Sequence, residues 1–495
     1  MQLKLALACL SLVAVTGCAA NRALCPQEGG RTWSEVQSTH FRIQTNLSPE
    51  AATTTALELE KHRRALLLAW GPDFDPPGTV EVILLRNQNE LDEFTHGRAA
   101  GFAGTTPSGP LLVMGGNGFV LEDSPDLRLQ THELAHYLSN FVLLRQPRWM
   151  AEGLAQYLET VQIKPSTNEV VLGRVSGWDL GYVKAHGWLD IDELWAWDQR
   201  GLLSSAESQR HYASAWLWVH YLYNVHTERM EEFQSRLANA EPPKKAWEAS
   251  FRGVQDLAGG LRTYVTSGRG SVFTLPLPEV PTKVDVRPME AADVHAVRAT
   301  LYLRSPGELK LEQRLEHAKR EVAQGLKEGP TSVNATILAT QLSRDAVTLD
   351  GVRAIVKANP DNGLAWDLLA DQLGQKGEVK EAEEARKRAA ELRPNDASIL
   401  NSLAWHYVQV REPAKGLAAA QRAVALSPGS SAILDTHAAL LFQLERCPEA
   451  LSLQQRAMDM LHERASDAMR QPLTERLQTY QAKCGGGTAP AAAKP

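Results

Sequence analysis

The chain has 495 residues, of which 43% are hydrophobic and 22% are charged, and its formal net charge at pH 7 is −6. A chain of this length is expected to form about two or three domains, and its composition is that of a globular protein. The negative charge excludes a basic surface for nucleic acid, and no apolar run beyond the N-terminus is long enough for a transmembrane helix.

The N-terminus has the pattern of an export signal. A short positive region precedes an apolar stretch over residues 5–15, which is too short to span a bilayer. The stretch leads to Val-Thr-Gly-Cys, which resembles a bacterial lipoprotein signal with removal of residues 1–17 and a lipid on Cys18. We therefore expect an exported lipoprotein of the cell envelope, and Ala19 after the cysteine favours the outer membrane, on its periplasmic or surface face. An ordinary signal peptide cut after Ala19 or Ala20 is the alternative.

A small α/β segment is predicted after this signal. Residues 18–32 are expected to form a tether, and a first domain is expected over residues 33–266. Apolar alternation and turn residues predict, in order, a strand at 39–45, a helix at 57–70, a strand at 79–85, a helix at 87–94 and a strand at 111–114.

The most informative motif is His132-Glu133-Leu134-Ala135-His136. Two histidines four residues apart lie one turn apart on the same face of a helix. Both imidazoles therefore reach one metal ion, and Glu133 is placed to take a proton from a water at that metal, as in zinc hydrolases. With 14 histidines in 495 residues, a chance match has a probability of about 3%, so the surrounding residues must decide.

A helix is expected around the motif. Ser124 is a suitable N-cap, Pro125 suits the first helical position, and Asp126 complements the positive end of the helix dipole. One apolar face at helical spacing consists of Leu127, Thr131, Leu134, Leu138 and Phe141. The two histidines and Glu133 lie off this face, where a metal cleft can form.

A third metal ligand is expected on the next helix. Glu152 follows His136 after 15 residues, and a carboxylate added to two imidazoles leaves one zinc position open for water. Glu159 lies on the same helix face and is the alternative ligand. A metzincin would have Gly and His at the positions of Ser139 and Val142, so that zinc pattern is excluded.

The segments HELAHYL and PRWMAEGLAQYLE resemble the gluzincin clan, specifically the peptidase MA-like domains of bacterial secreted proteins and lipoproteins. The resemblance is specific over about 30 residues and looser over residues 33–266. It implies zinc bound by His132, His136 and Glu152, with Glu133 as the catalytic base. The gap to the third ligand is shorter than in thermolysin-like enzymes.

Two further features of the first domain bear on substrate binding. In zincins an edge strand beside the active-site helix pairs with the substrate backbone, and residues 111–114 are the candidate, with a buried strand as the alternative. Family counterparts often have Tyr at the position of Tyr212, within the helices predicted over residues 191–266. Tyr212 or His211 is a candidate donor to the oxyanion, and an aromatic side chain in the helical core is the alternative.

The C-terminal half contains a repeat. Pro360, Pro394 and Pro428 are each 34 residues apart, which is the length of a tetratricopeptide (TPR) unit. Small residues occur where paired helices approach closely, among them Ala370, Ala382, Ala389, Ala404, Gly416, Ala423, Ala438, Ala450 and Ala457. We therefore predict three TPR units and a capping helix over residues 359–483.

The segments around the repeats are less regular. Residues 267–289 are rich in Pro, Gly and Val and are expected to form a linker or a single strand. Residues 290–358 are expected to be helical and to hold degenerate units, and residues 484–495 to be disordered. In an exported protein a disulfide between Cys447 and Cys484 is permitted, with two free thiols as the alternative.

Together these patterns predict an α+β zincin-like catalytic domain followed by an all-α TPR solenoid. The leading hypothesis is a lipid-anchored, Zn²⁺-dependent metallopeptidase that cleaves a peptide or protein substrate and binds a protein partner through its TPR surface. One alternative is a TPR scaffold or assembly lipoprotein whose peptidase-like domain binds peptides without cutting them. Another is a zinc hydrolase that acts on a different bond, and the repeats have the alternative role of a spacer.

Overall fold

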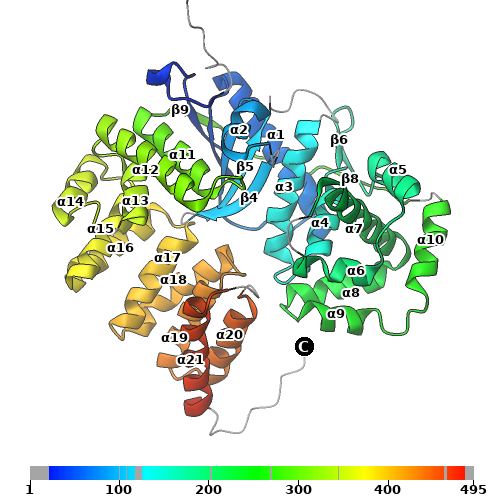
Figure 1. Ribbon diagram of the computed structural model, residues 1–495. Helices are drawn as coiled ribbons and strands as arrows, with labels where there is room; N and C mark the ends of the chain where they lie inside the picture. Colours follow the sequence, from blue (N-terminus) through cyan, green and yellow to red (C-terminus); the bar gives the residue numbers. More distant parts are fainter. Residues whose placement is uncertain are drawn as a thin grey trace, which may run out of the picture.

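The computed structural model describes residues 22–97, 99, 101–106, 109–116, 125–200, 203–267, 270–343, 345–461 and 465–484. The predicted signal peptide, the lipidation site Cys18, the N-cap Ser124 and the tail beyond Cys484 lie outside the described residues. An α/β region with a central sheet forms the N-terminal half, and a long, entirely helical region follows it (Figure 1). No described helix is long and apolar enough to cross a membrane.

A six-stranded mixed sheet forms the centre of the α/β region. From edge to edge its strands are β4 (Gly101–Thr106), β5 (Gly109–Gly115), β3 (Val80–Leu85), β2 (Phe41–Thr45), β1 (Ser34–Gln37) and β9 (Asp285–Pro288). The neighbouring strands β5, β3 and β2 are parallel, and β4, β1 and β9 each pair antiparallel with a neighbour.

The prediction that residues 111–114 form an edge strand is wrong. Residues 111–114 belong to β5, which pairs with β3 on one side and β4 on the other, and all four side chains are buried. The edge of the sheet next to β5 belongs to β4, whose sequence Gly-Phe-Ala-Gly-Thr-Thr lacks the apolar alternation of a half-buried strand.

Helices cover both faces of the sheet. The long helices α1 (Pro49–Leu67) and α3 (Pro125–Val142) pack on one face, where Phe41, Ile43 and Leu112 are buried. The short helix α2 (Gln88–Thr95) contributes to the other face with α11 (Ala291–Arg304), α12 (Leu311–Glu328) and α13 (Val333–Leu342). Ile83 and Val113 are buried on this second face, so the first helices of the helical region share a core with the sheet.

A helical subdomain and a small second sheet complete the α/β region. The second sheet has the order β6 (Gln162–Lys164), β7 (Glu169–Leu172) and β8 (Phe273–Pro276). The helices are α4 (Arg148–Leu158), α5 (Gly177–His186), α6 (Ile191–Trp195), α7 (Ser205–Val225), α8 (Thr227–Ala238), α9 (Pro243–Ser250) and α10 (Leu257–Ser267). Aromatic side chains fill their core, with Trp149 stacked on Phe233 and edge-on to Trp195 and Trp247.

Two segments expected to be connectors are parts of the fold. Within residues 267–289, β8 pairs with β7 and β9 pairs with β1, so this segment contains two strands. Within residues 18–32, Ala23 and Cys25 are fully buried among the residues packed against α11 and α12. Both expectations failed because the partners of these segments lie far away in the sequence.

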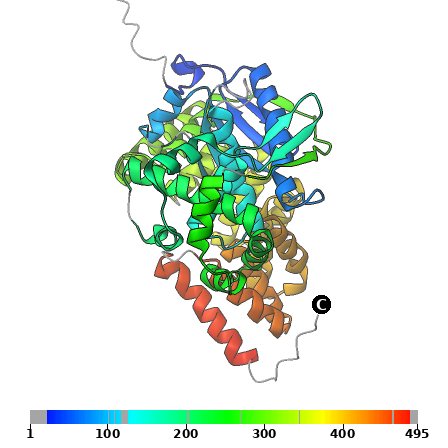
Figure 2. The ribbon, with the colours of Figure 1, turned by 90° about the vertical axis from the view of Figure 1, so that its right-hand side faces the viewer.

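The helical region forms an arc of paired helices. Three antiparallel pairs are α15 (Gly363–Lys376) with α16 (Val379–Leu392), α17 (Ala397–Gln409) with α18 (Pro413–Leu426), and α19 (Ser431–Gln443) with α20 (Cys447–Asp459). The first helices of these pairs begin 34 residues apart, which confirms the predicted repeat. The helix α14 (Leu349–Ala358) precedes them, and α21 (Asp467–Cys484) ends the arc at the far end from the sheet (Figures 1 and 2).

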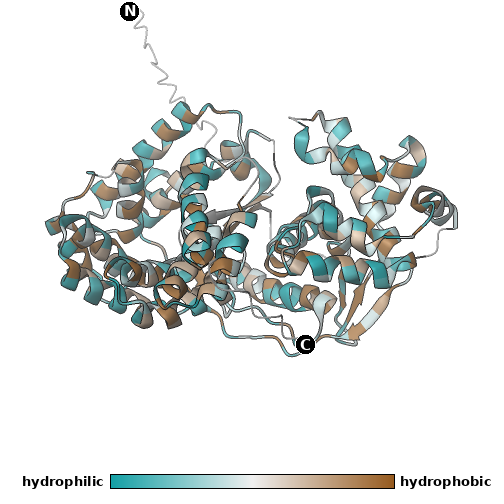
Figure 3. Cartoon of the chain, turned by 90° about the horizontal axis from the view of Figure 1, so that it is seen from below, coloured by the Kyte–Doolittle hydropathy of each residue, from teal (hydrophilic) through white to brown (hydrophobic). Residues whose placement is uncertain are grey.

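Small buried residues hold the pairs together. Ala382, Ala404, Ala438 and Ala450 are at most 1% exposed, as their positions in the repeat predicted. The helices carry hydrophobic and hydrophilic residues on different faces (Figure 3). A disulfide joins Cys447 to Cys484, which confirms the predicted pairing and ties α21 to the last repeat.

Candidate metal centre

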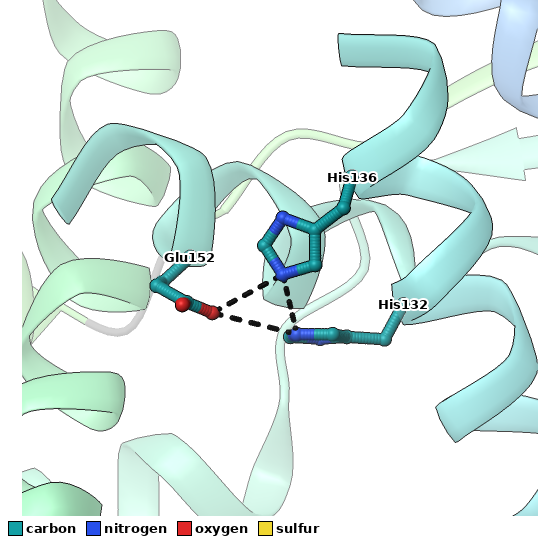
Figure 4. A group of neighbouring side chains, drawn as sticks. All are labelled: His132, His136 and Glu152. Atoms are coloured by element: carbon teal, nitrogen blue, oxygen red, sulfur yellow. Dashed lines mark hydrogen bonds and ion pairs between the residues drawn. The ribbon is translucent and has the colours of Figure 1, made fainter. Parts of the chain in front are cut away.

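The face of α3 that packs on the sheet determines where the side chains of the centre point. Leu134 and Leu138 on α3 are fully buried against the sheet, so His132 and His136 project from another face of the helix. After α3 the chain turns at once, and Gln146 Nε2 donates to Ser139 Oγ at 3.0 Å. This turn folds α4 back onto α3, and Glu152 on α4 faces the two histidines (Figure 4).

Three side chains converge from these two helices. His132 Nε2 lies 3.0 Å from His136 Nε2, and Glu152 Oε2 lies 3.6 Å and 3.2 Å from the same two nitrogens (Figure 4). Two ligands at tetrahedral positions, each about 2.0–2.1 Å from zinc, are about 3.3 Å apart. Two imidazole nitrogens and one carboxylate oxygen at these separations fit a zinc ion with one open position.

The electrostatics of Glu152 fit a ligand role. Burial alone would favour the protonated carboxyl, but the contacts with His132 and His136 outweigh burial and lower the pKa of Glu152 to about 2. Glu152 is therefore a carboxylate at neutral pH.

Glu159 occupies a different place from the one expected of an alternative ligand. Its Oε2 lies 2.8 Å from His132 Nδ1, on the side of the ring away from Glu152 and His136. A carboxylate at Nδ1 holds the proton on that nitrogen and leaves the Nε2 lone pair for a metal. Glu159 therefore orients His132 from behind.

The side chain of Glu133 extends from α3 toward the edge strand β4. Its side chain is buried, and this burial raises its pKa. A Cβ atom on Gly101 of β4 would lie 3.6 Å from Glu133 Cγ, so the carboxyl is close to the free edge of the sheet. The glutamate of the motif thus faces a surface where an extended chain has backbone groups to pair with.

The two donor candidates on α7 differ in position. His211 is 2% exposed, and its Nδ1 lies 2.7 Å from the carbonyl oxygen of Glu207, so it belongs to the helical core. Tyr212 is only partly buried, and burial together with the negative charge of Glu152 raises its pKa to about 12. The charge of Glu133 also raises this pKa, so Tyr212 lies near both carboxylates. The phenol therefore keeps its proton at neutral pH.

One buried carboxyl near the centre was missed by the sequence analysis. Asp179, at the start of α5, is 2% exposed and accepts a hydrogen bond from Ser176 Oγ at 2.5 Å. Burial raises its pKa to about 6, and the nearby charge of Glu159 acts in the same direction. The spacing Ser-x-x-Asp is a helix-start signal, but nothing in the sequence places α5 beside α3.

A family model matches residues 131–244, and its description is a protein of unknown function, DUF1570. The match covers less than a quarter of the chain and spans the HExxH motif, Glu152 and Tyr212. No curated protein matches the chain.

The solved structures that match include proteins described as TPR proteins. The MamA structure is 19% identical with a TM-score of 0.25, over 30% of this chain and 90% of MamA. A thermophilic TPR protein of Thermus thermophilus is 21% identical with a TM-score of 0.30, over 38% and 99%. The Pseudomonas aeruginosa PilF protein is 15% identical with a TM-score of 0.29, over 40% and 93%. With TM-scores this low, the matches support no conclusion beyond the helix pairs already described. None of these three descriptions names a metal or a peptidase activity.

Proposed function

We propose that this protein is a zinc-dependent metallopeptidase with a zincin-like catalytic region, a membrane anchor on Cys18 and a TPR module that binds protein. One observation carries the proposal. The Nε2 atoms of His132 and His136 and one oxygen of Glu152 lie 3.0–3.6 Å apart, and they come from two helices that pack tightly together. A chance HExxH sequence on a surface helix has no reason to face a third ligand on a neighbouring helix.

When bound, Zn²⁺ supplies Lewis acidity, which lowers the pKa of water to about 7 and polarises a carbonyl. Glu133 takes the proton of the attacking water and later delivers it to the leaving amine. Its burial raises its pKa, which favours this return of the proton. Tyr212 keeps its proton and is a candidate donor to the negative oxygen that forms on the substrate.

The free edge of β4 is suited to hold the substrate. β4 pairs with β5 on one side, and no strand of the described residues pairs with its other side, which lies beside Glu133. An extended peptide that pairs with this edge gains main-chain hydrogen bonds irrespective of its sequence. The substrate class is therefore an extended segment of peptide or protein.

A binding scaffold is the second candidate function. The three helix pairs form a stack of the kind that offers an extended surface to a peptide or protein. In this case the α/β region binds a peptide without cutting it.

Metal analysis and a cleavage assay separate the two candidates. Purified protein is analysed for zinc and incubated with a mixed peptide library, with and without a chelator. We expect about one zinc per chain and chelator-sensitive cleavage. His132→Ala should lose both, and the exposed control His186→Ala should keep both. Metal-free protein without cleavage would instead support the scaffold.

A further inference from the structure

A cavity lies between the helix that carries the HExxH motif and the helical repeats. Its volume is about 610 Å³, within the range of about 300–1,000 Å³ typical of ligand pockets. Tyr137, Asn140 and Phe141 of α3 line one side. The start of α17 and the turn between α18 and α19 line the other, with residues such as Ser398, Asn401 and Ala432. We call this space the interdomain cavity.

Direct contacts fix the repeats against the catalytic region beside this cavity. Arg145, in the turn between α3 and α4, lies 3.9 Å from Asp459 at the end of α20. A Cβ atom on Gly429 would lie 3.8 Å from Leu144 Cδ2, so the turn before α19 also contacts this segment. The two walls of the interdomain cavity are therefore held together at its margin.

Residues of α3 that line the cavity lie on the same face of the helix as Glu133. Glu133, Tyr137 and Asn140 follow one another at spacings of four and three residues, which keeps them on one helix face, and Leu144 lies in the turn just after α3. At 1.5 Å per residue, Tyr137 and Asn140 lie about 6 and 10 Å beyond Glu133 along the helix axis.

The free edge of β4 runs in the same direction. Gly101 at its start lies beside Glu133, and Thr105 near its end pairs with Pro110, which lines the cavity. An extended chain advances about 3.3 Å per residue. A substrate paired with β4 at Glu133 therefore reaches the cavity about three to five residues from the bond that is cut.

The side chains that line the cavity are uncharged. No acidic, basic or histidine side chain occurs among the lining residues within the described part of the chain. Tyr137, Asn140, Ser398 and Asn401 offer hydroxyl and amide groups, and Asn401 Oδ1 is buried without a hydrogen-bond partner there. Polar, uncharged groups of a bound peptide can pair with the hydroxyl and amide groups of this lining, whereas a charged side chain would lose hydration without gaining an ion pair.

We propose that the interdomain cavity receives the substrate residues three to five positions from the scissile bond, and that the repeats thereby select substrates with uncharged residues at these positions. The proposal rests on the proposed peptidase function. It gives α17 and α19 a direct part in substrate choice, in addition to any partner bound elsewhere on the repeats.

Cleavage of a proteome-derived peptide mixture by the zinc-loaded full chain tests the proposal, with the cut sites identified by mass spectrometry. Wild-type protein should disfavour charged residues three to five positions away on one side of the cut, by about tenfold. Ala432→Trp places an indole in the cavity from an exposed position and should abolish this preference. Ala418→Trp, at an exposed position on α18 outside the cavity lining, should retain it.

Ser398→Phe serves as a second cavity-filling variant, and thermal unfolding midpoints close to wild type establish that both variants are folded. Cleavage by wild type without any positional preference would overturn the proposal and leave the peptidase function standing. A preference that persists in both folded variants would overturn it as well. Complete absence of metal-dependent cleavage would refute the peptidase function, and the proposal with it.

Discussion

The metal centre and the helical repeats depend on different kinds of contact. At the centre, three polar side chains from α3 and α4 meet at one point, with Glu159 behind one of them. In the repeats, each helix packs on its neighbours through small buried residues such as Ala382 and Ala438, and no single contact dominates. Substitutions at the centre should therefore remove one function and preserve the fold, whereas changes in the repeats should lower stability and preserve the metal.

The largest effect is expected from Glu133→Gln. The amide cannot accept the proton of the attacking water, so the cleavage rate should fall by about 10²–10⁴-fold. Zinc content and the unfolding midpoint should remain close to wild type, because the three ligands are untouched. The readouts are kcat on a library-derived peptide and metal analysis, and Glu169→Gln at a distant surface position is the control. Wild-type activity in Glu133→Gln would refute its role as the base.

The disulfide between Cys447 and Cys484 tests the comparison in the helical repeats. Cys447 and Cys484 are 37 residues apart, and closing a loop of this size stabilises the folded state by about 2–4 kcal/mol. The double variant Cys447→Ser/Cys484→Ser should show this loss in chemical denaturation, in a transition of the last repeat. Its zinc content and cleavage of short peptides should not change. Wild-type protein treated with a reductant should match the variant, and loss of metal in either would contradict the separation of the two regions.

Glu159→Ala is expected to have an intermediate effect at the centre. Without the carboxylate at Nδ1, His132 loses its fixed orientation and tautomer, so zinc affinity should fall by about 10- to 100-fold. Competition with a chelator of known affinity measures this change. Excess zinc should restore most of the activity, which distinguishes a positioning residue from a ligand. Unchanged zinc affinity would exclude this role for Glu159.

The same contrast explains which features could be predicted from the sequence. The convergence at the centre depends on local spacing, with His132 and His136 one turn apart and Glu152 on the next helix. The repeat also follows from local information, since its period is visible in Pro360, Pro394 and Pro428. The zinc itself and the peptidase activity stay predictions.

Features that depend on distant partners could not be predicted. Val36 in β1 pairs with Val286 in β9, and no local pattern in a Pro-rich segment indicates such a partner. The burial of Cys25 depends on helices that begin more than 250 residues later, and it raises the pKa of its thiol to about 12. The edge position of β4 likewise depends on pairing with β5 rather than on its own residues.

The smallest expected effect concerns the ion pairs that join the two regions. Glu93 on α2 lies 3.0 Å from the buried guanidinium of Arg298 on α11 and also accepts a hydrogen bond from Tyr302 at 3.0 Å. Burial raises the pKa of Glu93, but the charge of Arg298 outweighs burial and holds this pKa below its ordinary value. The native state therefore favours the carboxylate more than the unfolded chain does.

This contribution has a defined pH window. It is fully present above the ordinary glutamate pKa of about 4.3 and is lost as the pH falls through the lower pKa of the folded state. Glu93→Gln should be less stable than wild type at pH 7, and the difference between their free energies of unfolding should shrink below about pH 4. Denaturation of both proteins across this range measures the difference, with the exposed Glu316→Gln as the control. A difference that does not depend on pH would mean that Glu93 stabilises the junction by packing and not by its charge.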